Sequence, residues 1–176
     1  MTSKLKISII GIKGYPYVYG GFETFIKEIS ERLIKKNCDV TIYCHKSLFV
    51  NKPKKIKGIN LIYIPSIETK ILSQPIHSFF SIIHACFSKC DIILVVNSSN
   101  GPLGLLTRIF KKTTVINVDG MEWLRPKWKG LGSIYFKWTS KMATIFYDQI
   151  ISDSDKMREV YLELFKKKSK VIAYGA

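Results

Sequence analysis

Short apolar runs alternate with amphipathic segments along this whole sequence, and that alternation limits the chain to a few folds. Seven runs are rich in β-branched residues and almost continuously apolar, which is typical of strands buried on both faces of a sheet. The predicted strands are Lys6–Ile12, Val40–Cys44, Ile59–Ile64, Ile92–Val96, Thr114–Val118, Gln149–Ile151 and Val171–Ala173.

The segments between these runs have apolar residues at helical spacing. Phe22–Lys36 is the clearest case, because its apolar residues form one stripe along a helix. The other predicted helices are Pro75–Ser88, Pro102–Phe110, Leu131–Tyr147 and Asp155–Lys168, the last capped by Ser154 or Asp153. Strands that alternate with helices predict an α/β domain, Rossmann-like and three-layered, with a mainly parallel sheet.

The length of 176 residues fits one domain with a core and is too short for two full ones. We therefore expect a single domain over residues 1–176. The chain ends in "KVIAYGA", a strand running into a small-residue turn, which predicts one half of a two-domain protein. No run reaches the ~20 apolar residues of a membrane span. The N-terminus lacks a signal peptide's apolar region, so we expect a cytoplasmic protein.

The chain has four cysteines, and their spacing does not match a zinc site. In a cytoplasmic chain they are expected to be reduced thiols. The sequence therefore predicts neither a metal nor a cofactor. The three histidines, His45, His77 and His84, have no partner at a recognisable spacing. His77 and His84 lie seven apart in one helical pattern, and both are expected to be structural.

The formal net charge is +15, which favours an anionic partner such as phospholipid, a pyrophosphate-bearing substrate or nucleic acid. Solubility is the alternative explanation for part of this charge. All three tryptophans and five Lys or Arg residues lie between Trp123 and Tyr147, where no acidic residue occurs. This mixture is typical of a membrane interface. The residues predicted to face the membrane are Trp123, Arg125, Lys127 and Trp128.

A glycine-rich loop, "GIKGYPYVYGG", follows the first predicted strand. Its spacing is neither GxGxxG nor a P-loop, which argues against a dinucleotide or NTPase site. The adjacent Gly20 and Gly21 precede a helix and could leave bare N–H groups where a phosphate can approach. The alternative is a tight turn with close strand–helix packing. Tyr15, Tyr17 and Tyr19 either stack on a sugar or pack over the loop.

The loop "NSSNGP" follows the fourth predicted strand. Ligands collect beyond the carboxyl ends of parallel strands, so this loop is expected to face the same site. Asn97, Ser98 and Asn100 offer hydrogen-bonding groups suited to a sugar acceptor. The alternative is an ordinary loop in which Asn100 caps the next helix.

Three blocks in order resemble retaining glycosyltransferases of family 4. They are "GIKGYPYVYGGFETFIKEISERL", "NVDGMEWLRPKW" and "SDSDKMREVY…VIAYGA", and together they span essentially the whole chain. The blocks resemble most closely the rhamnosyltransferase branch of that family.

This resemblance implies a GT-B architecture, in which two Rossmann-like domains face each other across a cleft. The chain matches the N-terminal, acceptor-side lobe. The C-terminal lobe that holds the nucleotide sugar is absent from it, so this lobe alone is expected to be inactive. The resemblance also implies that Gly20 and Gly21 border the donor's diphosphate.

Many members of the resembled family carry a histidine beside the transferred sugar, and Asp119 stands at the corresponding place here. We expect Asp119 to act as a catalytic residue, either as a base for the acceptor or by accepting hydrogen bonds from sugar hydroxyls. The alternative is an Asp-Gly turn at the end of a strand. Glu122 either binds the acceptor or pairs with Arg125 or Lys127.

The implied function is transfer of rhamnose or another hexose from a dTDP- or UDP-sugar to a lipid-linked saccharide in bacterial cell-surface polysaccharide synthesis. The implied location is peripheral, at the inner face of the plasma membrane, with a possible separate C-terminal lobe as partner and no nucleic acid. The alternative is a non-catalytic basic α/β module that binds anionic lipid or nucleic acid. A nicotinamide-linked enzyme is disfavoured, since Cys44-His45 stand where an acidic ribose ligand would end the second strand.

Overall fold

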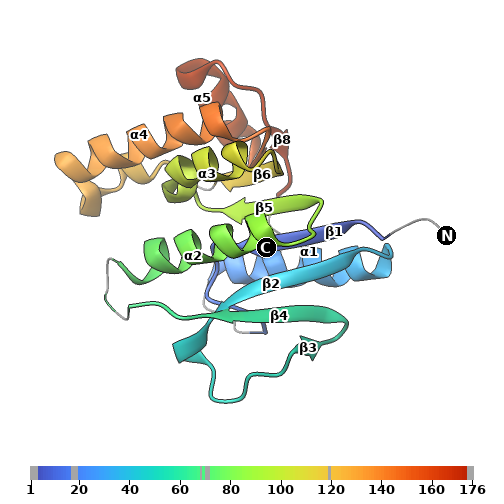
Figure 1. Cartoon of the computed structure of the whole chain (residues 1–176). Coiled ribbons are helices and arrows are strands. Elements are labelled where there is room, and N and C mark those ends of the chain that lie inside the picture. Colours follow the sequence, from blue (N-terminus) through green and yellow to red (C-terminus); the bar gives the residue numbers. More distant parts are fainter. Residues whose placement is uncertain (1–3, 17–19, 68, 70–71, 119, 174–176) are drawn as a thin grey trace. The chain divides into compact units, whose positions relative to one another are not determined.

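The computed structural model describes residues 4–16, 20–67, 69, 72–118 and 120–173. It shows a three-layer α/β fold with an eight-stranded, mainly parallel sheet in the order β3-β4-β2-β1-β5-β6-β7-β8 (Figure 1). The fold class predicted from the sequence is thereby confirmed. The chain divides into two compact units, residues 1–94 and 95–174, and each is described separately below.

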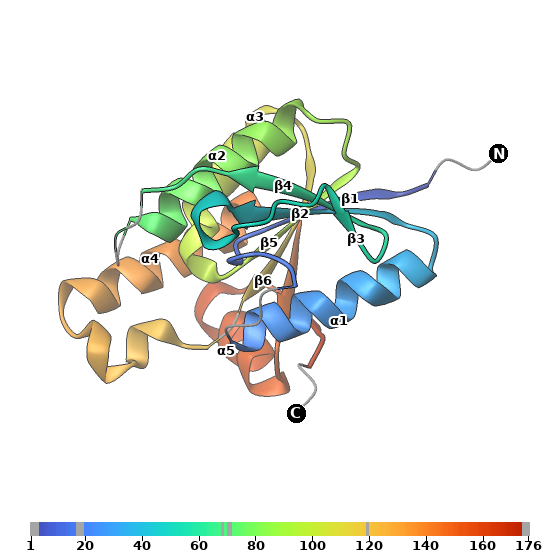
Figure 2. The same ribbon diagram turned by 90° about the horizontal axis from the view of Figure 1, so that it is seen from below.

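The N-terminal unit is built on three parallel strands, with β1 paired to β2 and β2 paired to β4. A short strand, β3, runs antiparallel along β4. Figure 2 shows α1 and α2 on opposite sides of these strands. The elements are β1 (Lys6–Ile10), α1 (Gly21–Lys35), β2 (Asp39–His45), η1 (Lys46–Leu48), β3 (Lys55–Ile56), β4 (Ile59–Ile64), α2 (Ser73–Phe87) and the start of β5 (Ile92–Val96).

The core of this unit follows from the apolar runs. Ile9 and Ile42 on neighbouring strands are fully buried, and so are Ile26 of α1 and Ile82 of α2. Burial of one such side chain stabilises the folded state by about 1.5–3 kcal/mol. The apolar contacts of these residues therefore hold both helices against the strands.

The C-terminal unit pairs β6, β7 and β8 in parallel. Its helix α3 contacts β6, whereas α5 contacts β7 and β8. The hydroxyl of Ser154 accepts the N–H of Met157 at 3.4 Å, which confirms Ser154 as the cap of α5. The elements are η2 (Ser98–Leu103), α3 (Gly104–Ile109), β6 (Thr113–Val118), η3 (Glu122–Leu124), η4 (Pro126–Trp128), α4 (Leu131–Phe146), β7 (Gln149–Ser152), α5 (Asp155–Phe165) and β8 (Lys170–Val171).

Two glycines let η2 and α3 pack closely against α4 and against Tyr147, which caps the C-terminal end of α4. A Cβ atom placed on Gly101 would lie 2.0 Å from the carbonyl oxygen of Thr139, and one on Gly104 would lie 2.5 Å from the ring of Tyr147. The face of α4 that packs here is accordingly small, with Thr139, Ser140 and Ala143 buried. This close packing fixes the loop after β5 against α4.

Several predicted boundaries were wrong by a few residues. The predicted helix Pro102–Phe110 begins earlier, at Ser98, as a 3₁₀ segment. The two-residue strand β3 was missed because it is too short to show a period of two. The predicted helix Pro75–Ser88 begins two residues earlier, at Ser73, and ends at Phe87. Within the described residues, no helix has the length and apolar character needed to cross a membrane.

Candidate functional site

The loop after β1 is bonded to two other elements of the N-terminal unit through Lys13. The N–H of Lys13 donates to Oε1 of Glu23 at 3.4 Å, in the first turn of α1. Its carbonyl oxygen accepts the N–H of His45 at 2.9 Å, at the carboxyl end of β2. The glycine loop is therefore held at the carboxyl ends of β1 and β2, which is the edge where ligands of parallel sheets bind.

Tyr15 anchors the same loop to α1. Its side chain is buried, and its hydroxyl donates to Oε1 of Glu31 at 2.9 Å. Burial, together with this hydrogen bond, raises the pKa of Tyr15 to about 12, whereas the Tyr15 and Lys57 hydrogen bonds lower the pKa of Glu31. Packing over the loop is confirmed for Tyr15. Tyr17 and Tyr19 lie outside the described residues.

Gly14 is a glycine of this loop that the protein's own packing requires. Its φ of +144° lies in a region that side chains disfavour, and an added Cβ would lie 2.7 Å from the ring of Phe49. This role of Gly14 was not predicted from the sequence. A tight approach of this kind depends on Phe49, which lies far along the chain, so local spacing could not reveal it.

Gly20 and Gly21 are both exposed, at the start of α1. Gly20 has φ −165°, an extended conformation open to any residue, and an added Cβ would meet only Oε2 of Glu23 at 3.7 Å. The fold therefore does not require glycine at position 20, and core side chains do not fill the space beside it. A role for the pair in binding a diphosphate stays a prediction.

Glu23 places a negative charge beside the glycine pair. Its side chain is buried in the first turn of α1, where a carboxylate is stabilised by the positive end of the helix. Two like charges 4 Å apart near a protein surface repel by about 4 kcal/mol before screening by salt. A phosphate that binds beside Gly20 would therefore do so against the field of Glu23.

A buried polar cluster at the carboxyl end of β2 was missed. The rings of His45 and His77 stack with centroids 3.8 Å apart, and both side chains are buried. Nε2 of His45 donates to Oε1 of Gln74 at 3.2 Å, and the Ser66 hydroxyl lies 3.1 Å from its Nδ1. These contacts pair β2 with α2 and the loop after β4. The two histidines are thus partners of each other, brought together by tertiary packing rather than by sequence spacing.

The predicted acceptor loop lies in the C-terminal unit, directly after β5. Asn97 is half-buried with φ +76°, and its side-chain oxygen accepts the N–H of Ser99 at 2.9 Å. Asn97 therefore caps the helical segment, and the alternative in which Asn100 is the cap was wrong. The N–H of Asn97 donates to the carbonyl oxygen of Asn117 at 2.9 Å, which ties this loop to β6.

Ser98 and Asn100 are buried within this unit. Nδ2 of Asn100 donates to the carbonyl oxygen of Val96 at 2.7 Å, and its own carbonyl oxygen accepts the Tyr147 hydroxyl at 3.0 Å. Ser98 lies beside the buried Tyr161, where burial raises the tyrosine pKa to about 12 and the serine hydroxyl offsets part of that shift. Of the predicted acceptor residues Asn97, Ser98 and Asn100, Asn97 is thus the most accessible to solvent.

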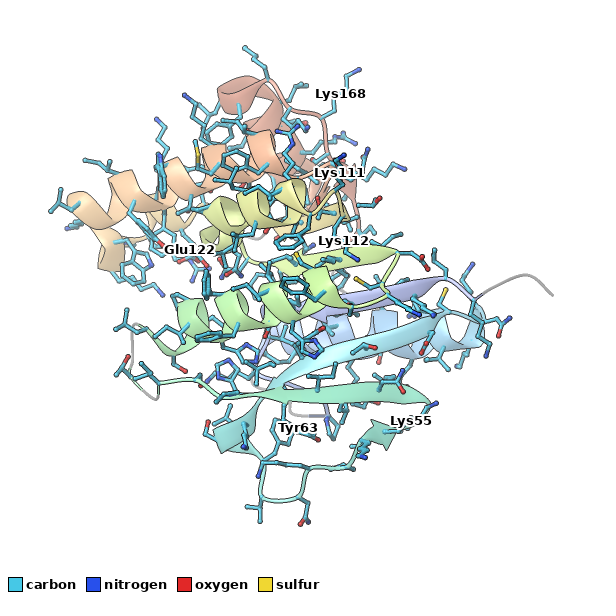
Figure 3. All side chains as sticks on the ribbon, viewed as in Figure 1. Lys55, Tyr63, Lys111, Lys112, Glu122 and Lys168 are labelled. Atoms are coloured by element: carbon cyan, nitrogen blue, oxygen red, sulfur yellow. The ribbon has the colours of Figure 1, made fainter. Side chains whose placement is uncertain are left out.

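Asp119, the predicted catalytic residue, lies outside the described residues. Glu122, which is labelled in Figure 3, follows in the same loop. Its carboxylate contacts other residues of the chain. It pairs with Nε of Arg125 at 2.8 Å, and it accepts the indole N–H of Trp128 at 3.0 Å. Nζ of Lys127 lies 4.0 Å away. Both ion pairs that the sequence analysis left open are present, and they give Glu122 the role of a clamp on residues 122–128.

Replacement of Glu122 by alanine is expected to lower the free energy of unfolding by about 2 kcal/mol. The change removes a charged hydrogen bond to Trp128 and leaves Arg125 without its carboxylate. Chemical denaturation followed by tryptophan fluorescence measures this loss. Glu163→Ala, which removes an exposed glutamate on α5, is the control. An equal loss of stability in both variants would contradict the clamp.

Trp123 does not face a membrane, contrary to the prediction. Its side chain is 7% exposed and packs edge-on against Phe165 with ring centroids 6.2 Å apart. Trp128 is half-buried against Phe136, whereas Arg125 and Lys127 are exposed. The error arose because composition reports which residues a segment contains and not which side of it they occupy.

Among the described residues, no group of three His, Cys, Asp or Glu side chains could hold a metal ion. All four cysteines are free thiols, and burial raises the pKa of Cys44 to about 11. Cys44 is therefore protonated and unreactive near neutral pH.

The fold is shared with solved glycosyltransferase structures. A structure of sucrose-phosphate synthase from Thermosynechococcus elongatus matches with a TM-score of 0.62 and 16% identity, over 97% of this chain and 90% of the other. UGT2 from Phytolacca americana, complexed with UDP-2-fluoro-glucose and pterostilbene, matches with a TM-score of 0.62 and 11% identity, over 100% of this chain and 55% of the other.

UGT89C1 from Arabidopsis thaliana, complexed with UDP-L-rhamnose, matches with a TM-score of 0.58 and 13% identity. The match covers 99% of this chain and 49% of UGT89C1, so the chain spans about half the length of these two plant proteins. At such identities the likeness shows the fold alone, which is that of a GT-B glycosyltransferase lobe.

No curated protein matches the sequence closely enough to count as a relative. A family match, in contrast, covers residues 4–176, which is nearly the entire chain. The chain therefore belongs to the family described as "Domain of unknown function (DUF1972)".

Proposed function

We propose that this chain is the acceptor-side lobe of a glycosyltransferase that uses a nucleotide-sugar donor. The observation that carries the proposal is the match of the whole chain to glycosyltransferases, two of them solved with a UDP-sugar. Fold alone does not define function. The proposal therefore also depends on the three sequence blocks and on the open space beside Gly20 at the start of α1.

The chemistry proposed for this lobe is stabilisation of a leaving diphosphate. Glycosyl transfer from a nucleotide sugar places growing negative charge on the diphosphate as the glycosidic bond breaks. Backbone N–H groups that point at this charge stabilise the transition state more than the ground state. The N–H of Gly21, an exposed residue at the positive end of α1, is the group that we assign to this task.

The donor is proposed to be a dTDP- or UDP-sugar carrying rhamnose or another hexose, and the acceptor a lipid-linked saccharide. Asp119 would act as the base or hydrogen-bond acceptor, and Asn97 would contact the acceptor. Glu122 would act mainly through its clamp on the loop that carries Asp119. A lipid-linked acceptor would also require contact with the membrane surface.

Replacement of Glu23 by glutamine is expected to strengthen the binding of UDP or dTDP about tenfold. The change removes a negative charge beside Gly20 but keeps an oxygen that can accept the N–H of Lys13. The gain is well below the unscreened repulsion because water and salt weaken it. Calorimetric titration measures the affinity, with Glu28→Gln on the same helix as the control. Weaker binding in Glu23→Gln would show that the carboxylate contacts the ligand.

The function is tested by sugar transfer in a protein that contains this chain together with a nucleotide-sugar lobe. Radiolabelled dTDP-rhamnose or a UDP-hexose is supplied with membranes that carry lipid-linked saccharide, and label in the lipid fraction is measured. Transfer that is lost in Asp119→Asn and Gly20→Val supports the proposal. Retention on anionic vesicles without any transfer or nucleotide-sugar hydrolysis would favour the non-catalytic basic module instead.

A further inference from the structure

Helix α4 has an unusual distribution of side chains. Its buried face is formed by Phe136 and three small residues, and the close approach at Gly101 explains why those are small. Its large apolar side chains are instead on the opposite, exposed face. That exposed stripe consists of Leu131, Ile134, Trp138 and Ile145, which are 85%, 66%, 48% and 42% exposed.

The spacing of these residues makes the stripe continuous, since positions three, four and seven apart share one side of a helix. An ordinary surface helix exposes its polar side and buries its apolar side. Folding of the C-terminal unit therefore does not account for the stripe. A continuous row of exposed apolar side chains is typical of an interaction surface.

The stripe borders a groove between α4 and the end of α5, with a volume of about 580 Å³. Ile134, Trp138, Ile145 and Leu164 supply apolar walls, and Lys137 and Lys141 stand among them. Both lysines are exposed. Helix α4 has no acidic residue, so the lysine charges along this face are not balanced by the helix that carries them.

We propose that this face of α4, with the adjoining groove, docks the C-terminal unit onto an anionic phospholipid bilayer. The apolar stripe would enter the boundary between headgroups and acyl chains, and the lysines would contact lipid phosphates. Nucleic acid fits less well, because binding to phosphates and bases would leave the exposed aliphatic side chains in water. The face replaces Trp123 as the membrane-contacting element, since Trp123 is buried.

The proposal does not depend on glycosyl transfer, because it concerns only the packing and charge of α4. A failure of vesicle binding would leave the donor site at Gly20 untouched. A failure of sugar transfer would likewise leave the membrane surface untouched.

The test compares binding of the full chain to phosphatidylglycerol–phosphatidylcholine vesicles and to phosphatidylcholine vesicles alone. We expect binding to the anionic vesicles and a decrease on raising the salt concentration. Each lysine near an anionic bilayer contributes a factor of about five, so Lys137→Gln with Lys141→Gln should weaken binding about thirtyfold. Lys52→Gln with Lys54→Gln, an equal change of charge on exposed residues of the N-terminal unit, is the matched control.

Tryptophan quenching locates the contact. Lipids brominated near the headgroup should quench fluorescence in the wild-type chain and in Trp128→Phe, whereas Trp138→Phe should lose most of that quenching. Trp138→Ser should weaken vesicle binding with only a small decrease in melting temperature, because about half of this side chain is already exposed.

Three results would overturn the proposal. One is equal loss of vesicle binding in both lysine pairs. Another is binding of an oligonucleotide, but not of vesicles, that depends on Lys137 and Lys141. The last is a concentration-dependent dimer that Trp138→Ser abolishes, which would assign the face to a second copy of the chain.

Discussion

Replacement of Gly101 by valine is expected to prevent the C-terminal unit from folding. A Cβ atom at this position would lie 2.0 Å from the carbonyl oxygen of Thr139 and 2.8 Å from the backbone nitrogen of Ala143. These are backbone atoms of α4, so no side-chain rotation can relieve the overlap. The helix would have to move away from the loop after β5, at a cost that we expect to exceed about 4 kcal/mol.

Circular dichroism melting and hydrogen exchange measure this effect. Amides of β6 and α4 should lose protection in Gly101→Val, and Gly101→Ala should show a smaller loss of the same kind. Gly20→Val is the control, because it makes the same glycine-to-valine change at a position where an added Cβ meets no backbone atom. A Gly101→Val variant as stable as the wild type would contradict the described packing of η2 on α4.

Replacement of Gly20 by valine is expected to lower sugar transfer by a factor of about a hundred or more while the fold is kept. The valine side chain would fill the open space beside position 20 and keep the diphosphate away from the N–H of Gly21. Loss of one such backbone donor to a developing negative charge typically lowers the rate by about 10²–10³. The extended backbone of Gly20 accepts any residue, and the cost of losing a glycine at the helix cap is about 1 kcal/mol or less. The same variant should bind UDP or dTDP more weakly.

Transfer is measured in the protein that joins this chain to a nucleotide-sugar lobe, and stability is measured on the chain itself. Thr24→Val is the matched control. It adds no bulk at the helix start and removes only a hydroxyl that donates to the carbonyl oxygen of Gly20 at 3.2 Å. Full transfer in Gly20→Val, or equal loss in Thr24→Val, would remove the glycine pair from the mechanism.

The sheet could be predicted from the sequence because its strands are buried on both faces and carry continuous apolar runs. Ile59–Ile64 and Ile92–Val96 were predicted with their observed bounds. Helices α1 and α5 were also predicted within a few residues, since each carries one apolar stripe and α5 has a serine cap. In these elements local pattern and final packing agree.

The candidate site could be predicted only in outline. A sequence shows that glycines are present, but not which of them the fold needs. A Cβ added at Gly14, Gly101 or Gly104 would lie within 3 Å of other atoms of the protein. The stacked His45 and His77 lie on different elements, so their pairing depends on how α2 packs over β2. Trp123 and Trp138 stand in the same basic segment, yet one is buried and the other is half exposed.

Amide spectra of the chain titrated with UDP or dTDP would test the central claim most directly. If the start of α1 binds a donor diphosphate, the ¹H–¹⁵N signals of Gly20, Gly21 and Phe22 should shift in a saturable way, and Gly20→Val should abolish the shifts. Saturable shifts confined to other parts of the chain, with these three signals unmoved, would contradict the account.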